Sequence, residues 1–266
     1  MAVLAHPDDE SLGMGGTLAK YAREDVDVFL LTATRGDRGR FHGRPSSDPE
    51  HPGPSALASI REAELRAAAS VLGVREVSLL DYQDQLLDSV NPREAVEHIA
   101  RELRRVRPDV VLTFGPDGGY GHPDHIAISQ FTTAAVVAAA GDTLDVDDAG
   151  EPHSISKLYY LAWPTSTYAA YQSVVGRLSS TVDGIERTVA PWPDWAITTA
   201  IDTRHVWATV WRAVSCHESQ LVAYERFKAL SPEHHESLWG HQSFYRVFST
   251  VNGGRACETD LFEGIQ

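Results

Sequence analysis

Two clusters of histidine and aspartate are the residues in this sequence best suited to hold a cation and move a proton. The first is His6-Pro7-Asp8-Asp9-Glu10, directly after a short apolar run, and the second is Gly121-His122-Pro123-Asp124-His125. Because charge at the end of a buried strand is unfavourable, a bound cation would explain both clusters. His6 and Asp9 are close enough in sequence to converge on one ion, which leaves Asp8 to handle a proton.

A simpler explanation of the first cluster is that Asp8 or Asp9 caps the helix that follows it. A lone pair of aspartates at a helix start most often has that role. The second cluster occurs in the same setting, after an apolar run and before a helical stretch. This repetition favours a metal site over a simple helix cap.

Apolar runs typical of buried parallel strands alternate with helical stretches along the first part of the chain. The strands are expected at residues 2–4, 26–34, 76–80, 109–114 and 158–163. The helices are expected at residues 11–23, 55–71, 92–105 and 126–140. This alternation predicts an α/β fold with a doubly wound, mostly parallel sheet and helices on both faces.

The expected strand order explains how the two distant clusters meet. In the doubly wound order 3-2-1-4-5 the first and fourth strands are neighbours, and ligands bind beyond their carboxyl ends. His6 follows the first strand, and residues 122–125 follow the fourth. The sequence therefore predicts one site built from both clusters.

The last third of the chain has weaker patterns. It suggests helices at 166–175 and 205–217, strands at 196–201 and 243–250, a short helix from Ser231-Pro232, and an acidic, solvent-exposed loop at 141–151. No linker or repeat divides the chain, so a single domain over residues 1–266 is expected. Within it, residues 1–140 form the metal-binding core, and residues 141–266 form a divergent α+β portion that specifies the substrate.

Composition excludes several classes of protein. The net charge of -14 over 266 residues argues against a nucleic acid or an anionic membrane surface as partner. The two cysteines, Cys216 and Cys257, are not in a paired spacing, so any metal must be held by histidine and carboxylate. No signal peptide is evident and the apolar stretch 134–140 is too short to cross a bilayer, which predicts a cytoplasmic location. The first strand is short, so the authentic start could lie upstream of Met1.

The paired motifs resemble the LmbE-like (PIG-L) family of zinc-dependent N-deacetylases, which includes a deacetylase of N-acetylglucosaminyl-inositol. The similarity covers residues 1–140, including the loop 34–39 and the helix 61–73, with a fainter echo in residues 217–220. The resemblance implies a Rossmann-like fold and one zinc ion per chain on His6, Asp9 and His125. It also implies that Asp8 is the general base.

Two imidazoles and one carboxylate leave an open coordination position, as catalytic zinc sites do. The expected reaction is removal of an acyl group, most simply acetyl, from the amide nitrogen of an amino-sugar conjugate by activated water. His122, oriented and kept basic by Asp124, is the candidate for stabilising the oxyanion. Tyr120 is either a further hydrogen-bond donor or a packed aromatic residue.

The resemblance further implies that Arg61 and an acidic residue after the third strand hold substrate hydroxyls or phosphate. Spacing does not decide whether that acid is Asp88 or Asp84. Three tryptophans could stack on a sugar or simply pack in the core, and these are Trp163, Trp192 and Trp195. A homo-oligomer is left open.

Other functions fit parts of the same pattern. A hydratase acting on an unsaturated carboxylic acid would need a basic pocket, which Arg35, Arg38 and Arg40 in the loop 35–55 could supply. The set of two histidines and one carboxylate also occurs in non-haem iron enzymes. A non-enzymatic metal-binding module would not need Asp8. A serine hydrolase is disfavoured because no Gly-x-Ser-x-Gly elbow occurs.

Overall fold

The computed structural model describes residues 1–141, 150–176, 179–182, 184–222, 225–254 and 256–265. Its centre is a seven-stranded sheet of order β3-β2-β1-β4-β5-β9-β8. The parallel strands are β1 (Ala2–Leu4), β2 (Phe29–Thr34), β3 (Glu76–Tyr82), β4 (Val110–Phe114) and β5 (Lys157–Leu161). The strands β9 (His241–Ser249) and β8 (Thr199–Asp202) extend the sheet by antiparallel pairing. The predicted strand order 3-2-1-4-5 is thereby confirmed.

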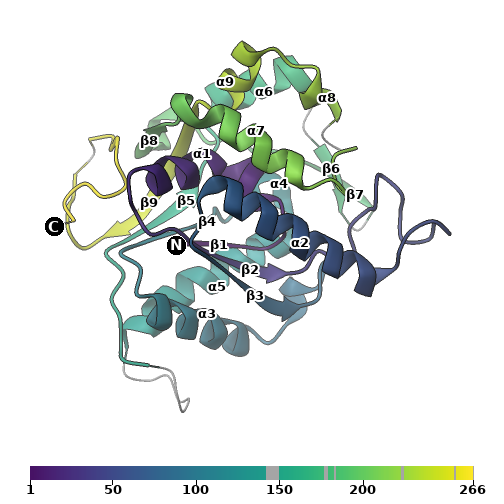
Figure 1. The fold of residues 1–266 in the computed structure, drawn as a ribbon. Coiled ribbons are helices and arrows are strands. Elements are labelled where there is room, and N and C mark those ends of the chain that lie inside the picture. Colours follow the sequence, from purple (N-terminus) through teal and green to yellow (C-terminus); the bar gives the residue numbers. More distant parts are fainter. Residues whose placement is uncertain (142–149, 177–178, 183, 223–224, 255, 266) are drawn as a thin grey trace.

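Helices cover both faces of the sheet, as expected for buried parallel strands. One face carries α3 (Pro92–Val106) and α5 (Pro123–Ala140), and the other carries α1 (Asp9–Arg23), α2 (Pro54–Leu72) and α7 (Trp207–Cys216) (Figure 1). The helices α1, α2 and α7 contact one another, and α3 contacts α5. Each layer shields the apolar strands, so that Ala2, Val3 and Leu4 of β1 are fully buried.

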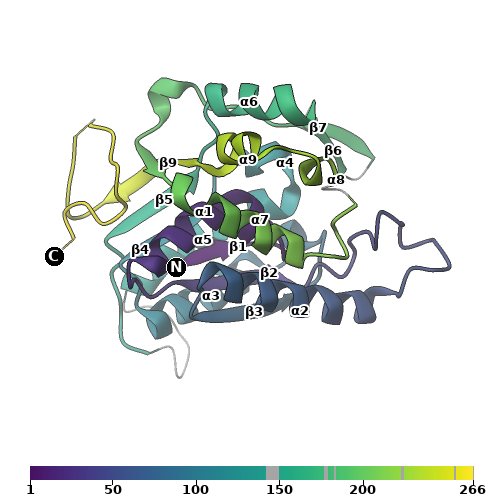
Figure 2. The same cartoon turned by 45° about the horizontal axis from the view of Figure 1, so that its top comes forward.

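The C-terminal third forms a separate group of short elements beyond α1 and α7 (Figure 2). It contains α6 (Thr165–Val175), the hairpin β6 (Ser179–Val182) and β7 (Ile185–Thr188), α8 (Glu225–Lys228) and α9 (Pro232–Trp239). Three short 3-10 helices lie at Leu87–Ser89, Asp194–Ala196 and Arg204–Val206. The one-turn helix α4 (Gly118–Gly121) contacts β7 and α5.

Differences from the predicted elements are concentrated in this third. The predicted strand 196–201 is shorter and later, because residues Asp194–Ala196 form a 3-10 turn before β8. The hairpin β6–β7 was not predicted, although the sequence between its strands carries the dipeptide Asp183-Gly184, a frequent hairpin turn. Most of the predicted acidic loop, at residues 142–149, lies outside the described residues.

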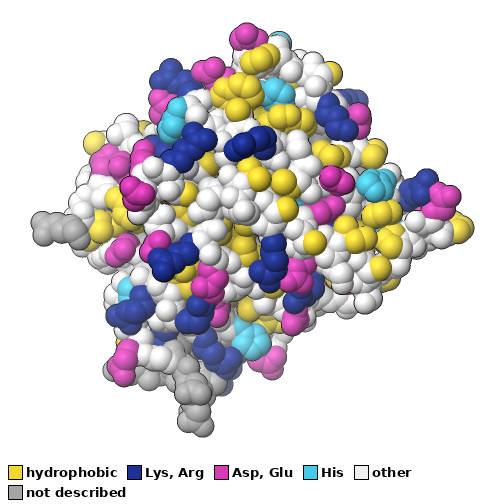
Figure 3. Space-filling view, in the orientation of Figure 1, with side chains coloured by type: hydrophobic (Ala, Val, Ile, Leu, Met, Phe, Trp, Pro, Cys, Tyr) yellow, Lys and Arg dark blue, Asp and Glu magenta, His cyan; other side chains and the backbone are white. Residues whose placement is uncertain are grey.

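The surface carries mixed charge on the face drawn in Figure 3. Lys and Arg side chains are interspersed there with Asp and Glu, and several Lys or Arg side chains lie near one another at the lower left of the view. Among the described residues, no helix has the length and apolar character that a bilayer crossing needs.

Candidate active site

The two histidine clusters meet at the carboxyl edge of the sheet because β1 and β4 are adjacent. The chain leaves β1 in a turn that is tied to the end of β2, since the Ala5 carbonyl accepts hydrogen bonds from the Thr34 backbone N–H at 2.9 Å and from Thr34 Oγ1 at 3.0 Å. His6 follows directly. On the neighbouring strand, residues Gly115–Asp117 and α4 bring His122 and His125 to the same edge.

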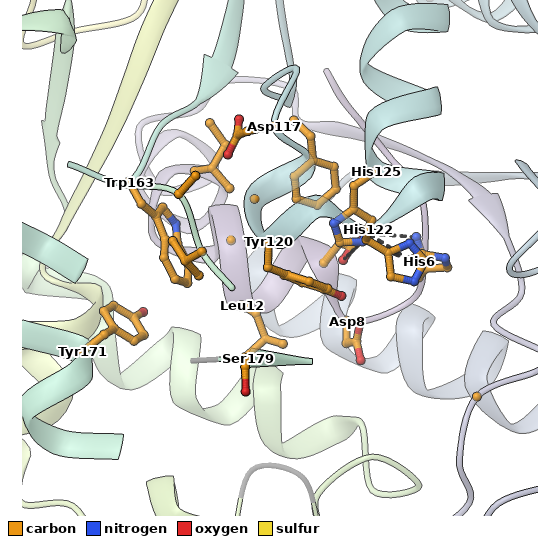
Figure 4. Close-up of a pocket in the computed structure, with 18 of the residues that line it drawn as sticks. His6, Asp8, Leu12, Asp117, Tyr120, His122, His125, Trp163, Tyr171 and Ser179 are labelled. Carbon is orange, nitrogen blue, oxygen red and sulfur yellow. Dashed lines mark hydrogen bonds and ion pairs between the residues drawn. The ribbon is translucent and has the colours of Figure 1, made fainter. Parts of the chain in front are cut away.

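Ligand atoms of three residues converge at the junction. His6 Nδ1 lies 3.1 Å from His125 Nε2, His125 Nε2 lies 3.3 Å from Asp9 Oδ1, and His6 Nδ1 lies 3.7 Å from Asp9 Oδ2. All three side chains are buried. Figure 4 shows the His6 and His125 rings facing one another on one side of a cavity. The predicted ligand set is therefore brought together.

The hydrogen bonds around these rings fix which nitrogens carry hydrogen. His6 Nε2 lies 3.0 Å from Asp124 Oδ2 and 3.1 Å from Asp84 Oδ1, so it donates to carboxylates. His125 Nδ1 lies 3.2 Å from the Gly118 carbonyl and donates to it. When both rings are neutral, the inward nitrogens His6 Nδ1 and His125 Nε2 carry lone pairs that face the Asp9 carboxylate. Asp9 Oδ2 also accepts the His6 backbone N–H at 2.8 Å. Two imidazole nitrogens and a carboxylate in this arrangement fit a divalent cation.

The pKa shifts agree with a site built for positive charge. Burial alone would lower the pKa of His6, but the Asp124, Asp84 and Asp9 carboxylates raise it well above its ordinary value. Burial alone would raise the pKa of Asp9, but His125 and His6 hold it well below its usual range. Asp9 is thus an ionised ligand candidate.

Two other groupings also bring ligand atoms close together among the described residues. The ligand atoms of His6, His122 and His125 lie within 4.8 Å of one another, and so do those of His6, Asp84 and Asp124. In the second set the carboxylates hydrogen-bond His6 on its outward nitrogen, as carboxylates that orient a ligating histidine do.

Asp8 occupies the turn before α1 with an unusual backbone conformation. Its φ is 103°, in the left-handed region that a residue with a Cβ seldom adopts. The side chain makes no capping hydrogen bond to α1, and its Oδ2 lies 3.3 Å from Arg61 Nη2. The helix-cap explanation is wrong for Asp8. Strain of this kind, of order 1 kcal/mol, is usual where a side chain must point into a site.

His122 begins α5, and its Nδ1 accepts a hydrogen bond from the Asp124 backbone N–H at 3.2 Å. The Asp124 carboxylate does not reach His122. It accepts from the backbone N–H groups of Gln85 at 2.7 Å and Leu87 at 3.0 Å, and it pairs with His6. The prediction that Asp124 keeps His122 basic is wrong, because the loop after β3 turns that carboxylate toward the other ring.

His122 is instead a poor base. Burial, together with the charges of His6 and His125, lowers the pKa of His122 to about 3. With Nδ1 accepting, the neutral ring carries its hydrogen on Nε2. Tyr120 lies edge-on to His122 and His125, at ring-centroid distances of 5.8 Å and 5.3 Å. Burial and nearby carboxylates raise the pKa of the Tyr120 phenol, so it stays a neutral donor.

Arg61 is almost fully buried and holds the polar turns together. Its Nη1 donates to the Gly36 carbonyl at 3.1 Å, and its Nη2 donates to the Pro7 carbonyl beside Asp8. Gly36 has φ +63, and a Cβ there would lie 2.1 Å from Arg61 Nη1, so the close approach requires glycine. Arg61 lines the cavity and positions Asp8.

Of the two acidic candidates after β3, only Asp84 lines the cavity. It is buried, and the hydrogen bond and charge of His6 hold its pKa at about 2, although burial alone would raise it. Asp88 lies in an exposed 3-10 turn, where its carboxylate accepts from Ser89 Oγ at 3.2 Å. The prediction of Asp88 as a substrate ligand is not supported, because that turn directs it to solvent.

The loop arginines do not form a basic pocket. Arg35 pairs with Glu62 and Asp81, and Arg40 Nη1 donates to the Gly43 carbonyl at 3.1 Å. Arg38 is exposed, and its backbone N–H, not its side chain, contacts Asp84. Of the residues 35, 38 and 40, none lines the cavity.

The cavity itself has a volume of about 510 Å³ and joins two unlike ends. At one end lie His6, Asp8, His122 and His125, and Figure 4 shows Tyr120 between them and the far end. The far end includes Trp163. Trp192 instead donates through Nε1 to Asp117 Oδ1 at 3.3 Å, and Trp195 is 87% exposed.

Two contributions to the site were not predicted. Glu10, quoted only as part of the first motif, accepts the Asp8 backbone N–H at 3.0 Å and pairs with His217 at 2.7 Å. The sequence signal for this Glu10–His217 pair is the weak family resemblance at residues 217–220. Asp117 lines the cavity as well, and burial raises the pKa of its carboxyl group.

Comparisons with known proteins agree with this geometry. Residues 1–136 match the family described as PIG-L, GlcNAc-PI de-N-acetylase. The 1D-myo-inositol 2-acetamido-2-deoxy-alpha-D-glucopyranoside deacetylase of Rhodococcus jostii (strain RHA1) is 35% identical, over 100% of this chain and 97% of its own length.

Two solved structures have a similar fold. One is N,N'-diacetylchitobiose deacetylase from Pyrococcus horikoshii, with a TM-score of 0.66 and 20% identity, covering 92% of this chain and 82% of that one. The other is the 4-carboxy-2-hydroxymuconate hydratase of Pseudomonas putida, with a TM-score of 0.68 and 19% identity, covering 96% and 98%. At these identities they support the fold alone.

Proposed function

The chain belongs to the PIG-L family, and from this we propose that it is a metal-dependent hydrolase that removes an acyl group from the amide nitrogen of an amino sugar. The observation that carries the proposal is the convergence of His6, Asp9 and His125 beside Asp8 in one cavity. Two imidazoles and one carboxylate are the donor set of a catalytic zinc site. Zinc held by these three residues would polarise the amide carbonyl and make water acidic enough to attack it.

The chain's own groups supply the proton transfers. Asp8, held by Arg61 and by its strained backbone, takes the proton of the attacking water and delivers it to the leaving amine. The amide C–N bond breaks and the products are a carboxylic acid and a free amine. The developing oxyanion accepts hydrogen bonds from His122 Nε2 and from the Tyr120 hydroxyl, both neutral donors.

The division of the chain follows the same logic. Residues 1–140 supply the metal ligands, the base and the donors, and residues 141–266 supply most of the far end of the cavity. The amino-sugar substrate is proposed from the name of the Rhodococcus relative. Location in the cytoplasm, lack of a nucleic-acid partner and homo-oligomerisation stay predictions.

The hydratase alternative is not favoured. A substrate with several carboxylates needs cations at the cavity, and Arg35, Arg38 and Arg40 lie elsewhere. Arg61 already neutralises Asp8. The metal analysis described next distinguishes a zinc enzyme from a non-haem iron enzyme.

The experiment that tests the function is metal analysis of the purified protein, coupled to detection of amine released from N-acetylglucosamine conjugates. About one zinc per chain and amine release that requires Asp8 are expected. Absence of amine release from the zinc-loaded protein, with hydration of an unsaturated acid in its place, would overturn the proposal.

A further inference from the structure

The far end of the cavity is an apolar chamber, and it is built from a different part of the chain than the polar end. Its walls include five aromatic or aliphatic side chains from residues 141–266 and one from α1, namely Leu12, Leu161, Trp163, Tyr171, Phe227 and Trp239. Of the six, Leu12 alone comes from within residues 1–136, the range that matches the family.

Part of the chamber wall is deeply buried. Leu161 is 8% exposed and Trp239 is 1% exposed, although both line the cavity. The Trp163 and Tyr171 rings stack at a centroid distance of 4.9 Å, and Figure 4 shows both on the side away from the histidines. A ligand group that packs against these walls is removed from much of the surrounding water.

The six wall side chains offer few hydrogen-bonding groups, namely the two indole N–H groups and the Tyr171 hydroxyl, although Asp117 and Ser179 also line the cavity. The Tyr171 hydroxyl donates to the Leu238 carbonyl at 3.2 Å, so its hydrogen is already used. A polyol has a hydroxyl on nearly every carbon, and burying such hydroxyls without partners is unfavourable. An alkyl or aryl group needs no partners and gains from the burial.

We propose that the substrate carries an apolar group that occupies this chamber while its amide lies beside Asp8 and the histidines. This rests on the proposed deacylase function and narrows its substrate class. The apolar group is either the acyl chain, longer than acetyl, or an aglycone attached to the amino sugar. Both sources share the chemistry that the chamber recognises.

The test measures amine release from two matched series. In the acyl series, the methyl glycoside of glucosamine carries N-acetyl or N-octanoyl. In the aglycone series, N-acetylglucosamine carries methyl, phenyl or inositol. In at least one series the apolar member is expected to have a kcat/KM about 10- to 100-fold above its small parent, and the series that responds identifies the source. Equal values in both series, or a preference for inositol without a preference for N-octanoyl, would overturn the inference.

Two tryptophan variants locate the effect. Trp163→Ala is expected to reduce the apolar preference about fivefold or more, whereas Trp195→Ala, at an 87% exposed position outside the cavity, should leave it unchanged. A preference that Trp163→Ala leaves intact would place the apolar group elsewhere and contradict the inference.

Binding measurements distinguish a failure of this inference from a failure of the proposed function. Calorimetric titration with the deacylated phenyl and methyl glycosides and with free octanoate needs no turnover. Tighter binding of the phenyl glycoside, or measurable binding of octanoate, with a more negative heat-capacity change is expected. If no substrate releases amine, the proposed function is wrong, and the binding measurements still show whether the chamber accepts an apolar group. If amine is released without apolar preference or binding, only the chamber assignment is wrong.

Discussion

His217 Nε2 lies 2.7 Å from Glu10 Oε1, and both side chains are fully buried. The contact joins the end of α7 to the first turn of α1. Glu10 Oε2 accepts the backbone N–H of Asp8 at 3.0 Å, so the strained turn of the proposed base is supported through Glu10 by a residue far along the chain.

The pair should make folding stability depend on pH. Burial alone would lower the pKa of His217, but Glu10 and Asp8 raise it above its ordinary value while Arg61 opposes them. A raised folded-state pKa stabilises the protein fully below the unfolded pKa of about 6.5, and this contribution is lost as pH rises through the folded value. In urea unfolding from about pH 6 to about pH 9.5, wild type should lose this contribution and His217→Gln should not.

The same variant should also be less stable at the low end of that range. Removing the histidine leaves the Glu10 carboxylate buried without its cation, which costs about 3 kcal/mol. Identical pH slopes in wild type and His217→Gln would mean that His217 does not titrate against Glu10.

Asp8→Asn separates the proton-transfer role of Asp8 from its backbone role. Asparagine tolerates a positive φ, so the turn should be kept and the free energy of unfolding should change by less than about 1 kcal/mol. The amide cannot accept the proton of water, so kcat should fall about 100-fold or more. Amine release close to the wild-type rate, with metal content unchanged, would exclude Asp8 as the general base.

The variants Asp9→Asn and His122→Asn test whether Asp9 or His122 binds the metal together with His6 and His125. Asp9 is an ionised carboxylate at 3.3 Å from His125 Nε2, so its loss should weaken zinc binding by more than about 100-fold. His122→Asn should keep the zinc stoichiometry and lose about 100-fold in kcat, as removal of an oxyanion donor does. Plasma mass spectrometry of both variants gives the stoichiometry. The reverse pattern would assign His122, not Asp9, to the metal.

Whether the sequence predicts a contact in this site depends on how far apart the two residues lie along the chain. Apolar runs identify the strands, and the order 3-2-1-4-5 then brings His6 and His125 together. Spacing does not determine which ring the Asp124 carboxylate meets, because the backbone N–H groups of Gln85 and Leu87, on a separate loop, orient it.

The same limit applies to contacts across the whole chain. Glu10 and His217 are 207 positions apart, and although each belongs to a motif of the family resemblance, no spacing pairs the two residues. The apolar chamber could not be predicted for the same reason. The helices α6, α8 and α9 are short, and no predicted strand order places them over α1. The local motifs predicted which residues carry out the chemistry. The residues that surround the far end of the cavity could be identified only from the tertiary structure.

Arg61→Lys tests whether Arg61 binds substrate, as predicted from the sequence, or positions the base. The guanidinium reaches Pro7, Gly36 and Asp8 together, and lysine can replace only one of these contacts. The Gly36 carbonyl keeps the Gly39 backbone N–H at 3.2 Å, but the loss of the Arg61 bonds to the Gly36 and Pro7 carbonyls should lower the free energy of unfolding by about 2 kcal/mol. Displacement of Asp8 should lower kcat about tenfold with little change in KM. Arg66→Lys, on the exposed face of the same helix where Arg66 pairs with Glu62, is the matched control and should change stability by less than about 0.5 kcal/mol. A rise in KM with unchanged kcat would return Arg61 to direct substrate binding.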